Sequence, residues 1–128
     1  MNLIEQVARH LEWLGFGTMA DANTDGDIFW AWMPDSPDDS VCVYSSDSGY
    51  AGSEDGARIQ IITRGKTAKA AYERSQAIVE ALAETEVYLG GDGAHASISL
   101  INASAGIGAD TKMREQFSSN FRILYCDT

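Results

Sequence analysis

Two stretches of the chain place apolar residues at helical spacing. Near the N-terminus, apolar residues recur every three or four positions from Leu3 until Gly15. Asn2 is a favourable N-cap, and Glu5 three residues later completes a capping box. From Thr67 onward a second stripe faces a row of charged residues, so two amphipathic helices are predicted. The two stripes consist of Leu3, Ile4, Val7, Leu11 and Leu14, and of Ala68, Ala71, Tyr72, Ser75, Ile78, Val79 and Leu82.

Five further stretches have the composition of β-strands, rich in aromatic and β-branched residues and bounded by turn residues. The first two are separated by PDSPDD, whose two prolines and acidic residues suit a turn, so a hairpin is expected there. A polar, glycine-rich loop at 45–56 precedes the third strand, and GGDG at 90–93 marks a turn before the fourth. The predicted strands are 27–33, 40–45, 58–63, 96–103 and 116–126.

The predicted elements follow the order α-β-β-β-α-β-β. A helix placed after three strands and before two more favours an α+β fold, with one mixed five-stranded sheet and both helices packed on one face. The other face of the sheet is then available to a partner. A chain of 128 residues has the usual size of one domain, here residues 1–128. The residues expected to face the same side of the sheet are Val7, Leu11, Tyr72, Ile78, Val79 and Leu82.

The charge of the chain argues against nucleic acid as its ligand. Acidic residues outnumber lysine and arginine by 19 to 9, which gives a formal net charge of −10. Such a chain repels a phosphate backbone, so specific nucleic-acid binding is not expected. No segment approaches the roughly 20 apolar residues that cross a bilayer, and no basic start with a long apolar run marks a secretory signal. We expect a soluble protein of a reducing compartment, without a membrane partner.

The residues that could ligate a metal or act in catalysis show no spacing that suggests a site. Cys42 and Cys126 each lie in a strand-like run and are expected to be small core residues. No CxxC motif or Cys/His cluster has zinc spacing, so no metal and no cofactor is predicted. His10 and His95 are isolated and expected at the surface. The loop carboxylates, expected to be solvated, are Asp35, Asp38, Asp39, Asp47, Glu54, Asp55 and Asp92.

No local motif indicates catalysis. Residues 64–67, RGKT, lie between a strand and a helix and resemble the end of a phosphate-binding P-loop, but Gln60 stands where the first glycine of that motif belongs. No serine or cysteine is marked as a nucleophile. We therefore predict no catalytic residue, and a small enzyme with an unrecognised site is kept as an alternative.

Residues 21–27, DANTDGD, match the first ligand positions and the sharp-turn glycine of an EF-hand calcium loop. The twelfth position of that loop should carry a bidentate glutamate, and here it is Trp32. The residues that follow alternate like a strand rather than a helix. An ordinary turn is therefore favoured, and a calcium-dependent binding module is the alternative. Its ligands would be Asp21, Asn23, Asp25 and Asp27, completed by water or a neighbouring chain.

Aromatic residues occupy both faces of the predicted strand 27–33. Trp30 and Trp32 lie on one face and Phe29 on the other. A strand that is bulky on both faces is expected to be buried on both. The helices supply part of that cover, and another subunit could supply the rest, which suggests a protein that assembles.

The C-terminal run IGADTKMREQFSSNFRILY resembles the end of a family of small siphophage proteins, the minor capsid or tail terminator (tail completion) proteins. In that family an apolar–glycine pair, an Asp, a basic turn and an alternating Ser-Asn-aromatic strand close the chain. Here Ala109 departs from the basic or polar residue expected before the Asp. The N-terminal helix ending at LGFG and the unit RIQIITRGKTAKAAYERSQAIVEAL are also similar to the family. The matching C-terminal residues are Ile107, Gly108, Asp110, Lys112, Arg114, Phe117, Ser119, Asn120, Phe121 and Tyr125.

The resemblance implies a structural role without an active site. Tail terminators form rings, commonly hexameric, at the head-proximal end of the tail, where they end growth of the tube and join tail to head. The implied partners are further copies of the chain, the tail tube protein and the head–tail connector protein. The implied location is the virion tail, assembled in the host bacterial cytoplasm, with a lumen of carboxylates that repels passing DNA. The residues expected at the subunit interface are Trp30, Trp32, Asp110, Lys112 and Arg114.

Overall fold

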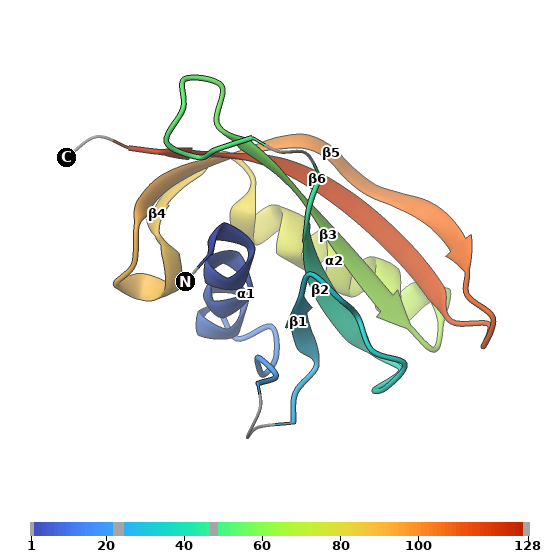
Figure 1. Ribbon diagram of the computed structural model, residues 1–128. Helices are drawn as coiled ribbons and strands as arrows, with labels where there is room; N and C mark the ends of the chain where they lie inside the picture. Colours follow the sequence, from blue (N-terminus) through green and yellow to red (C-terminus); the bar gives the residue numbers. More distant parts are fainter. Residues whose placement is uncertain (1, 22–24, 47–48, 127–128) are drawn as a thin grey trace.

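The computed structural model describes residues 2–21, 25–46 and 49–126, and it consists of a curled sheet with two helices against it (Figure 1). The sheet has six strands in the order β1-β2-β3-β6-β5-β4. The helices are α1 (Leu3–Trp13) and α2 (Ala68–Leu82), with a short 3-10 helix η1 (Leu89–Gly91); the strands are β1 (Ile28–Trp30), β2 (Ser40–Ser45), β3 (Ala57–Gly65), β4 (Thr85–Tyr88), β5 (His95–Ala109) and β6 (Glu115–Tyr125).

Both predicted helices are confirmed, and each begins at the expected cap. The side chain of Asn2 accepts a hydrogen bond from the amide of Glu5 at 2.8 Å, and that of Thr67 accepts one from Ala70 at 3.1 Å. These bonds satisfy amides that the first helical turn leaves without a partner. After α1, Gly15 takes a φ of 92°, a conformation that favours glycine and takes the chain out of the helix.

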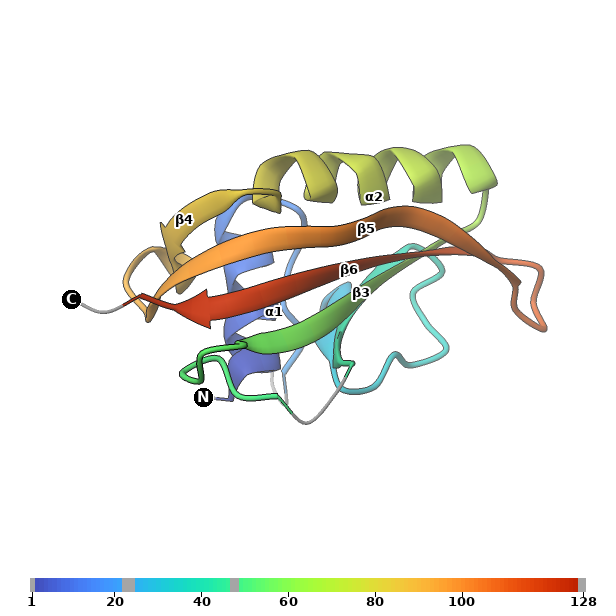
Figure 2. The same cartoon turned by 90° about the horizontal axis from the view of Figure 1, so that it is seen from above.

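The two helices pack on the same face of the sheet, as expected (Figure 2). Leu11 of α1 and Leu82 of α2 are both fully buried in one apolar core. Tyr72 is partly exposed, but its ring meets that of Phe117 edge-on at 5.3 Å, so it also faces the sheet. The strands contribute alternate residues to this core, including Val41, Val43, Ile59, Ile61, Ile98, Phe121 and Ile123.

The sheet has six strands rather than the five predicted, because β4 was missed. Its residues TEVY form a short edge strand with no fully buried residue, so the sequence carries little hydrophobic signal. β4 pairs antiparallel with β5, from Thr85 opposite Ile98 to Tyr88 opposite His95.

The predicted hairpin between the first two strands is wrong, because β1 and β2 are parallel. Ala31 ends β1 with a φ of 67°, and its amide donates to the carbonyl of Val43. The chain then returns beside β2, where the backbone of Trp32 meets the side chain of Cys42, and it enters β2 in the same direction as β1. PDSPDD is therefore part of a crossing segment, residues 31–39, rather than a tight turn.

The last two strands form a hairpin much longer than predicted. β5 extends to Ala109, and β4 covers its outer edge only as far as Ile98. From there to the turn, β5 has β6 on one side and, among the described residues, no strand on the other. The distal part of the hairpin, residues 101–117, is called the arm below. Figure 1 shows the turn at its tip reaching past the end of β3.

Candidate interaction surface

The tip of the arm is a tight turn organised by one carboxylate. Oδ1 of Asp110 accepts hydrogen bonds from the amides of Lys112 and Arg114, both at 3.0 Å. Its Oδ2 accepts from Nε of Arg114 at 2.8 Å and lies 2.7 Å from Nη2 of the same guanidinium. These bonds, the guanidinium first among them, lower the pKa of Asp110 to about 2.

The same arginine fastens the arm to the crossing segment. Nη2 of Arg114 lies 2.9 Å from Oδ1 of Asp35, and its Nη1 lies 3.3 Å from Oδ1 of Asp38. Lys112 also contacts the carboxylate of Asp35, and this hydrogen bond is the main reason that the pKa of Asp35 is lowered. Arg114 is only 5% exposed. Two carboxylates expected to be solvated, Asp35 and Asp38, are therefore partners of one buried cation.

A second arginine, Arg64, binds the crossing segment through its backbone carbonyls. Arg64 donates to the backbone carbonyls of Pro34 at 2.9 Å, Pro37 at 2.7 Å and Asp38 at 3.2 Å. Burial, and then the charge of nearby Arg114, lowers the pKa of this guanidinium. The carbonyl oxygens satisfy a cation that would otherwise be costly to bury. The crossing segment and the arm thus form one connected unit.

The predicted interface residues separate into two groups in the structure. Asp110, Lys112 and Arg114 are engaged within the chain, and their place at a subunit interface stays a prediction. Trp30 is half-buried and packs against the core, whereas Trp32 is 71% exposed. The expectation that the tryptophan strand is buried on both faces is therefore wrong for Trp32, because β1 ends before it.

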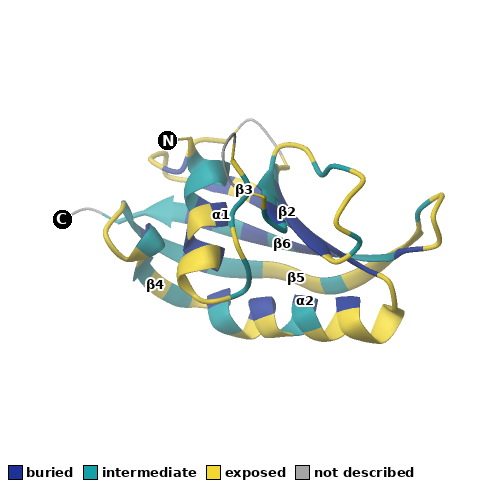
Figure 3. Ribbon diagram, turned by 90° about the horizontal axis from the view of Figure 1, so that it is seen from below, coloured by how far each residue is buried: buried dark blue, intermediate teal, exposed yellow. Residues whose placement is uncertain are grey.

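Four of the large exposed apolar side chains among the described residues belong to this unit. Trp32 lies on the crossing segment, and Ile101, Ile107 and Met113 lie along the arm, where Met113 is 76% exposed. Figure 3 shows the distal part of β5 coloured as exposed, in contrast to the buried centre of the sheet. The arm and the crossing segment, residues 101–117 and 31–39, are therefore the candidate interaction surface.

The sheet face opposite the helices is polar. Gln60 donates to the hydroxyl of Ser118 at 2.8 Å, and Asn120 donates to the side chain of Asn102 at 2.7 Å. Arg122 donates to a loop carbonyl, that of Asp55, at 2.6 Å. The first two bonds join neighbouring strands and the third joins β6 to a loop, so these positions offer hydrogen-bonding groups rather than an apolar patch to a partner.

Asp27, one of the four predicted calcium ligands, is already bonded within the chain. Oδ1 of Asp27 accepts from the amide of Thr18 at 2.8 Å, and Oδ2 pairs with Nη2 of Arg74 at 2.9 Å. Asn23 lies outside the described residues. A carboxylate that is already paired with a guanidinium is a poor additional ligand for a cation.

The remaining two ligands of that alternative are exposed. Asp21 and Asp25 line an open hollow of about 530 Å³ together with Phe29 and Pro34. A calcium ion takes six to eight oxygen ligands, as a rule. Two exposed carboxylates beside apolar rings fall well short of that number.

His10 and the P-loop-like segment both make hydrogen bonds that hold the fold together. His10, expected at the surface, is buried, and its Nδ1 accepts from the amide of Gly90 at 2.9 Å, so it joins α1 to η1. Burial lowers the pKa of this imidazole.

At the P-loop-like segment, residues 64–67, the carboxylate of Asp39 accepts a hydrogen bond from the amide of Lys66 at 3.0 Å. An acidic side chain at this position repels a phosphate.

A cluster that the sequence did not reveal lies at the other end of the sheet. Glu86, His95 and Cys126 can each offer one metal-ligand atom, and these atoms all lie within 4.8 Å of one another. Cys126, expected in the core, is half-buried here, and His95 is paired with Glu86 rather than isolated. Glu86 belongs to the missed strand β4, and Cys126 is distant in the sequence from the other two, so no spacing motif indicates the cluster.

None of the helices in the described residues is long and apolar enough to span a membrane.

A family model described as bacteriophage tail terminator protein matches residues 10–125 of the chain. No curated protein matches the chain.

Proposed function

The chain belongs to the bacteriophage tail terminator family, and we propose that it forms a ring at the head-proximal end of a phage tail, ends growth of the tube there and joins the tail to the head. The family match extends over α2 and all six strands. The role is structural rather than catalytic. The partners in this proposal are further copies of the chain, commonly six in a ring, the tail tube protein and the head–tail connector protein.

The observation that carries the ring proposal is the free edge of β5. Residues 99–109 contain no charge and no proline, the two devices that most often protect an edge strand from pairing with another chain. The edge retains two protections: bulges in the register with β6, and the carboxylate of Glu84, which accepts a hydrogen bond from the amide of Leu100 at 2.9 Å. A long uncharged edge with exposed Ile101 and Ile107 is well suited to pairing with a neighbouring subunit.

A closed ring needs two different patches on each subunit, one for each neighbour. The β5 edge is the first patch in this proposal. The second includes Trp32, which is exposed and lies on the crossing segment, the segment that Arg64 and Arg114 bind at Pro34 and Asp35. Because Arg114 ties the arm to the crossing segment, the two patches keep a fixed relative orientation. Such an orientation favours one ring size over a mixture.

The net charge of −10 supports the same role. DNA must pass through the ring without adhering to it, and negative side chains at the lumen repel its phosphates. We therefore expect surface carboxylates that are not in ion pairs to line the channel.

The test is made on virions. Electron microscopy should place the protein as a ring at the head-proximal end of the tail, and deletion of its gene should give tails of uncontrolled length that do not join heads. Supplying the gene in trans should restore normal tails, and so should the Asp21→Ala/Asp25→Ala variant, which leaves the arm intact. Deletion tails of normal length that still join heads would refute the terminator role.

A further inference from the structure

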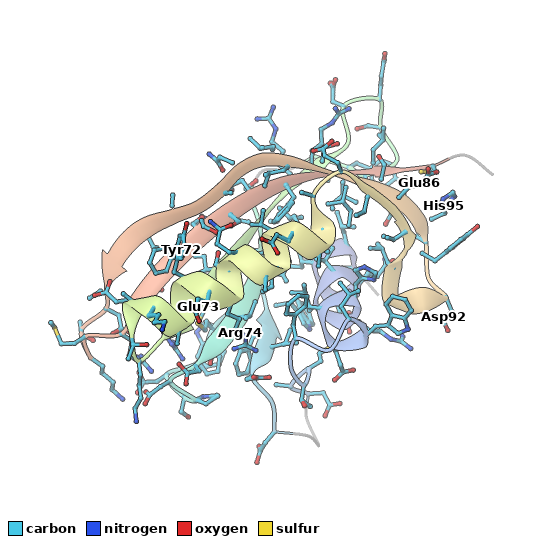
Figure 4. The ribbon with its side chains drawn as sticks, turned by 180° about the vertical axis from the view of Figure 1, so that it is seen from behind. Tyr72, Glu73, Arg74, Glu86, Asp92 and His95 are labelled. Carbon is cyan, nitrogen blue, oxygen red and sulfur yellow. The ribbon has the colours of Figure 1, made fainter. Side chains whose placement is uncertain are left out.

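The backbone brings Glu86, His95 and Cys126 together from three neighbouring segments. In the β4–β5 ladder, Tyr88 is opposite His95 and Glu86 is opposite Ser97. Just after β6, the amide of Cys126 donates to the carbonyl of His95 at 2.9 Å. These backbone bonds fix the positions from which the three side chains extend. Figure 4 shows Glu86 and His95 close together near the C-terminal end of the sheet.

The side chains are close enough to share an ion. Oε1 of Glu86 lies 3.1 Å from Nε2 of His95, and the ligand atoms of all three residues lie within 4.8 Å of one another. Zinc bonds of about 2.0–2.3 Å in a tetrahedron set neighbouring ligand atoms about 3.3–3.8 Å apart. Side-chain rotations that move these atoms by about 1 Å would therefore give zinc geometry.

The imidazole of His95 is held in place and incompletely bonded. Its ring stacks on that of Tyr88, with centroids 4.6 Å apart and an angle of 17° between the planes. Nδ1 of His95 is buried and has no hydrogen-bond partner among the described residues. The stacking thus fixes the orientation of the ring, with Nε2 toward the carboxylate of Glu86. The side chain of Glu86 is 61% exposed, so an ion can reach the cluster from solvent.

We propose that Glu86, His95 and Cys126 bind a zinc ion. A thiolate, an imidazole and a carboxylate together are a typical ligand set for zinc, whereas calcium and magnesium prefer oxygen ligands only. The three protein ligands leave a fourth position to water or to a group of a neighbouring protein. The ion would connect β4, β5 and the end of β6, on the part of the sheet away from the arm. The inference does not depend on the terminator role.

The competing interpretation is an ordinary hydrogen-bonded Glu86–His95 pair with a thiol beside it. Cobalt separates the two, because a cobalt ion bound to a thiolate gives a ligand-to-metal absorption band in the near ultraviolet. Metal-free protein titrated with cobalt chloride should show this band at one equivalent, and zinc chloride should remove it by displacement. Calcium chloride should have no effect. A folded wild-type protein without the band would overturn the proposal.

The chain supplies its own controls, because it has two histidines and two cysteines. Cys42 is buried on another part of the sheet, and burial raises the pKa of its thiol to about 11, which makes it a poor metal ligand. Cys126→Ser should abolish the cobalt band, and Cys42→Ser should retain it. His95→Gln should weaken zinc binding at least tenfold. A band that survives in Cys126→Ser would overturn the assignment.

A second measurement needs no variant. Alkylation of the native protein by iodoacetamide should modify Cys126 in the absence of zinc, and zinc chloride should slow that modification at least tenfold, as measured by mass spectrometry. Cys42 should react slowly in both conditions because it is buried. Equal rates at Cys126 with and without zinc would contradict the proposal even if every variant failed to fold.

Discussion

Nη2 of Arg74 lies 2.9 Å from the carboxylate of Asp27, and this ion pair joins α2 to the segment that leads into β1. The same nitrogen donates to the carbonyl of Phe16 at 2.6 Å. Both groups are only partly exposed, so the pair is better shielded than a surface salt bridge. One of the four carboxylate and amide residues of the calcium alternative is thus a structural contact between a helix and a loop.

Calcium should therefore leave the stability of the protein unchanged. A ligand raises the melting temperature only when it occupies the native state, and Asp27 is occupied by Arg74. Thermal unfolding followed with millimolar calcium, and with magnesium as the control, should give the same melting temperature in both. A calcium-specific increase that disappears in Asp21→Ala and Asp25→Ala would show that the loop does bind the ion.

Truncation of the core where α2 meets the sheet should be costly. Leu82 is fully buried, so Leu82→Ala should lower the free energy of unfolding by about 2–5 kcal/mol. Urea denaturation measures the change. Leu14→Ala is the matched control, since Leu14 is 37% exposed and its truncation should cost much less. Equal costs at the two positions would contradict the core described above.

The turn at the tip of the arm should weaken in acid. The pKa of Asp110 is about 2 in the folded protein, below the value of about 3.9 for an unperturbed aspartate. Because the folded pKa is the lower one, Asp110 contributes stability above about pH 4 and loses that contribution as the pH falls toward 2.

Asp110→Asn should therefore be less stable than the wild type near neutral pH, and the difference should shrink progressively below about pH 4. Melting temperatures measured from neutral pH down to about pH 2 test this. Asp21→Asn, at an exposed position, controls for the change in net charge. A difference between Asp110→Asn and wild type that stays constant with pH would count against the Asp110–Arg114 arrangement.

Local sequence signals predicted the parts of the fold that depend on local interactions. The caps Asn2 and Thr67 and the helical stripes gave both helices almost to the residue, because helix ends and amphipathic faces depend on near neighbours. β3 was also located within two residues, since its inward positions are β-branched. The packing of both helices on the same face of the sheet was predicted because the apolar stripe of each helix must be buried against apolar residues of the sheet.

Strand pairing and the functional surface depend on contacts that sequence patterns do not carry. Alternation predicts a strand but gives no direction for its partner, and the parallel β1–β2 pairing rests on the positive φ of Ala31 and on Arg64 reaching a distant segment. Asp35 and Asp38 are exposed, as expected of loop carboxylates, but nothing local indicated that Arg114 would reach them. The long edge of β5 was underestimated because its small residues resemble a loop.

The last prediction concerns that edge. Ile107 is 50% exposed on the arm, so Ile107→Lys should fold normally yet place a charge on the strand edge that we propose to pair with the next subunit. In a phage from which the gene has been deleted, this variant supplied in trans should fail to restore tails of normal length or their joining to heads, as seen by electron microscopy.

Tyr50→Lys is the matched control, because Tyr50 is 68% exposed and contacts Tyr125 at the other end of the sheet, away from the arm. It should complement as well as the wild type, since it introduces the same charge at a position outside the proposed contact. If Ile107→Lys complements equally well, the β5 edge is not the subunit contact, even if the protein still forms the terminal ring. If both variants fail although both are folded, added positive charge rather than the edge is responsible, and the interface must be sought elsewhere.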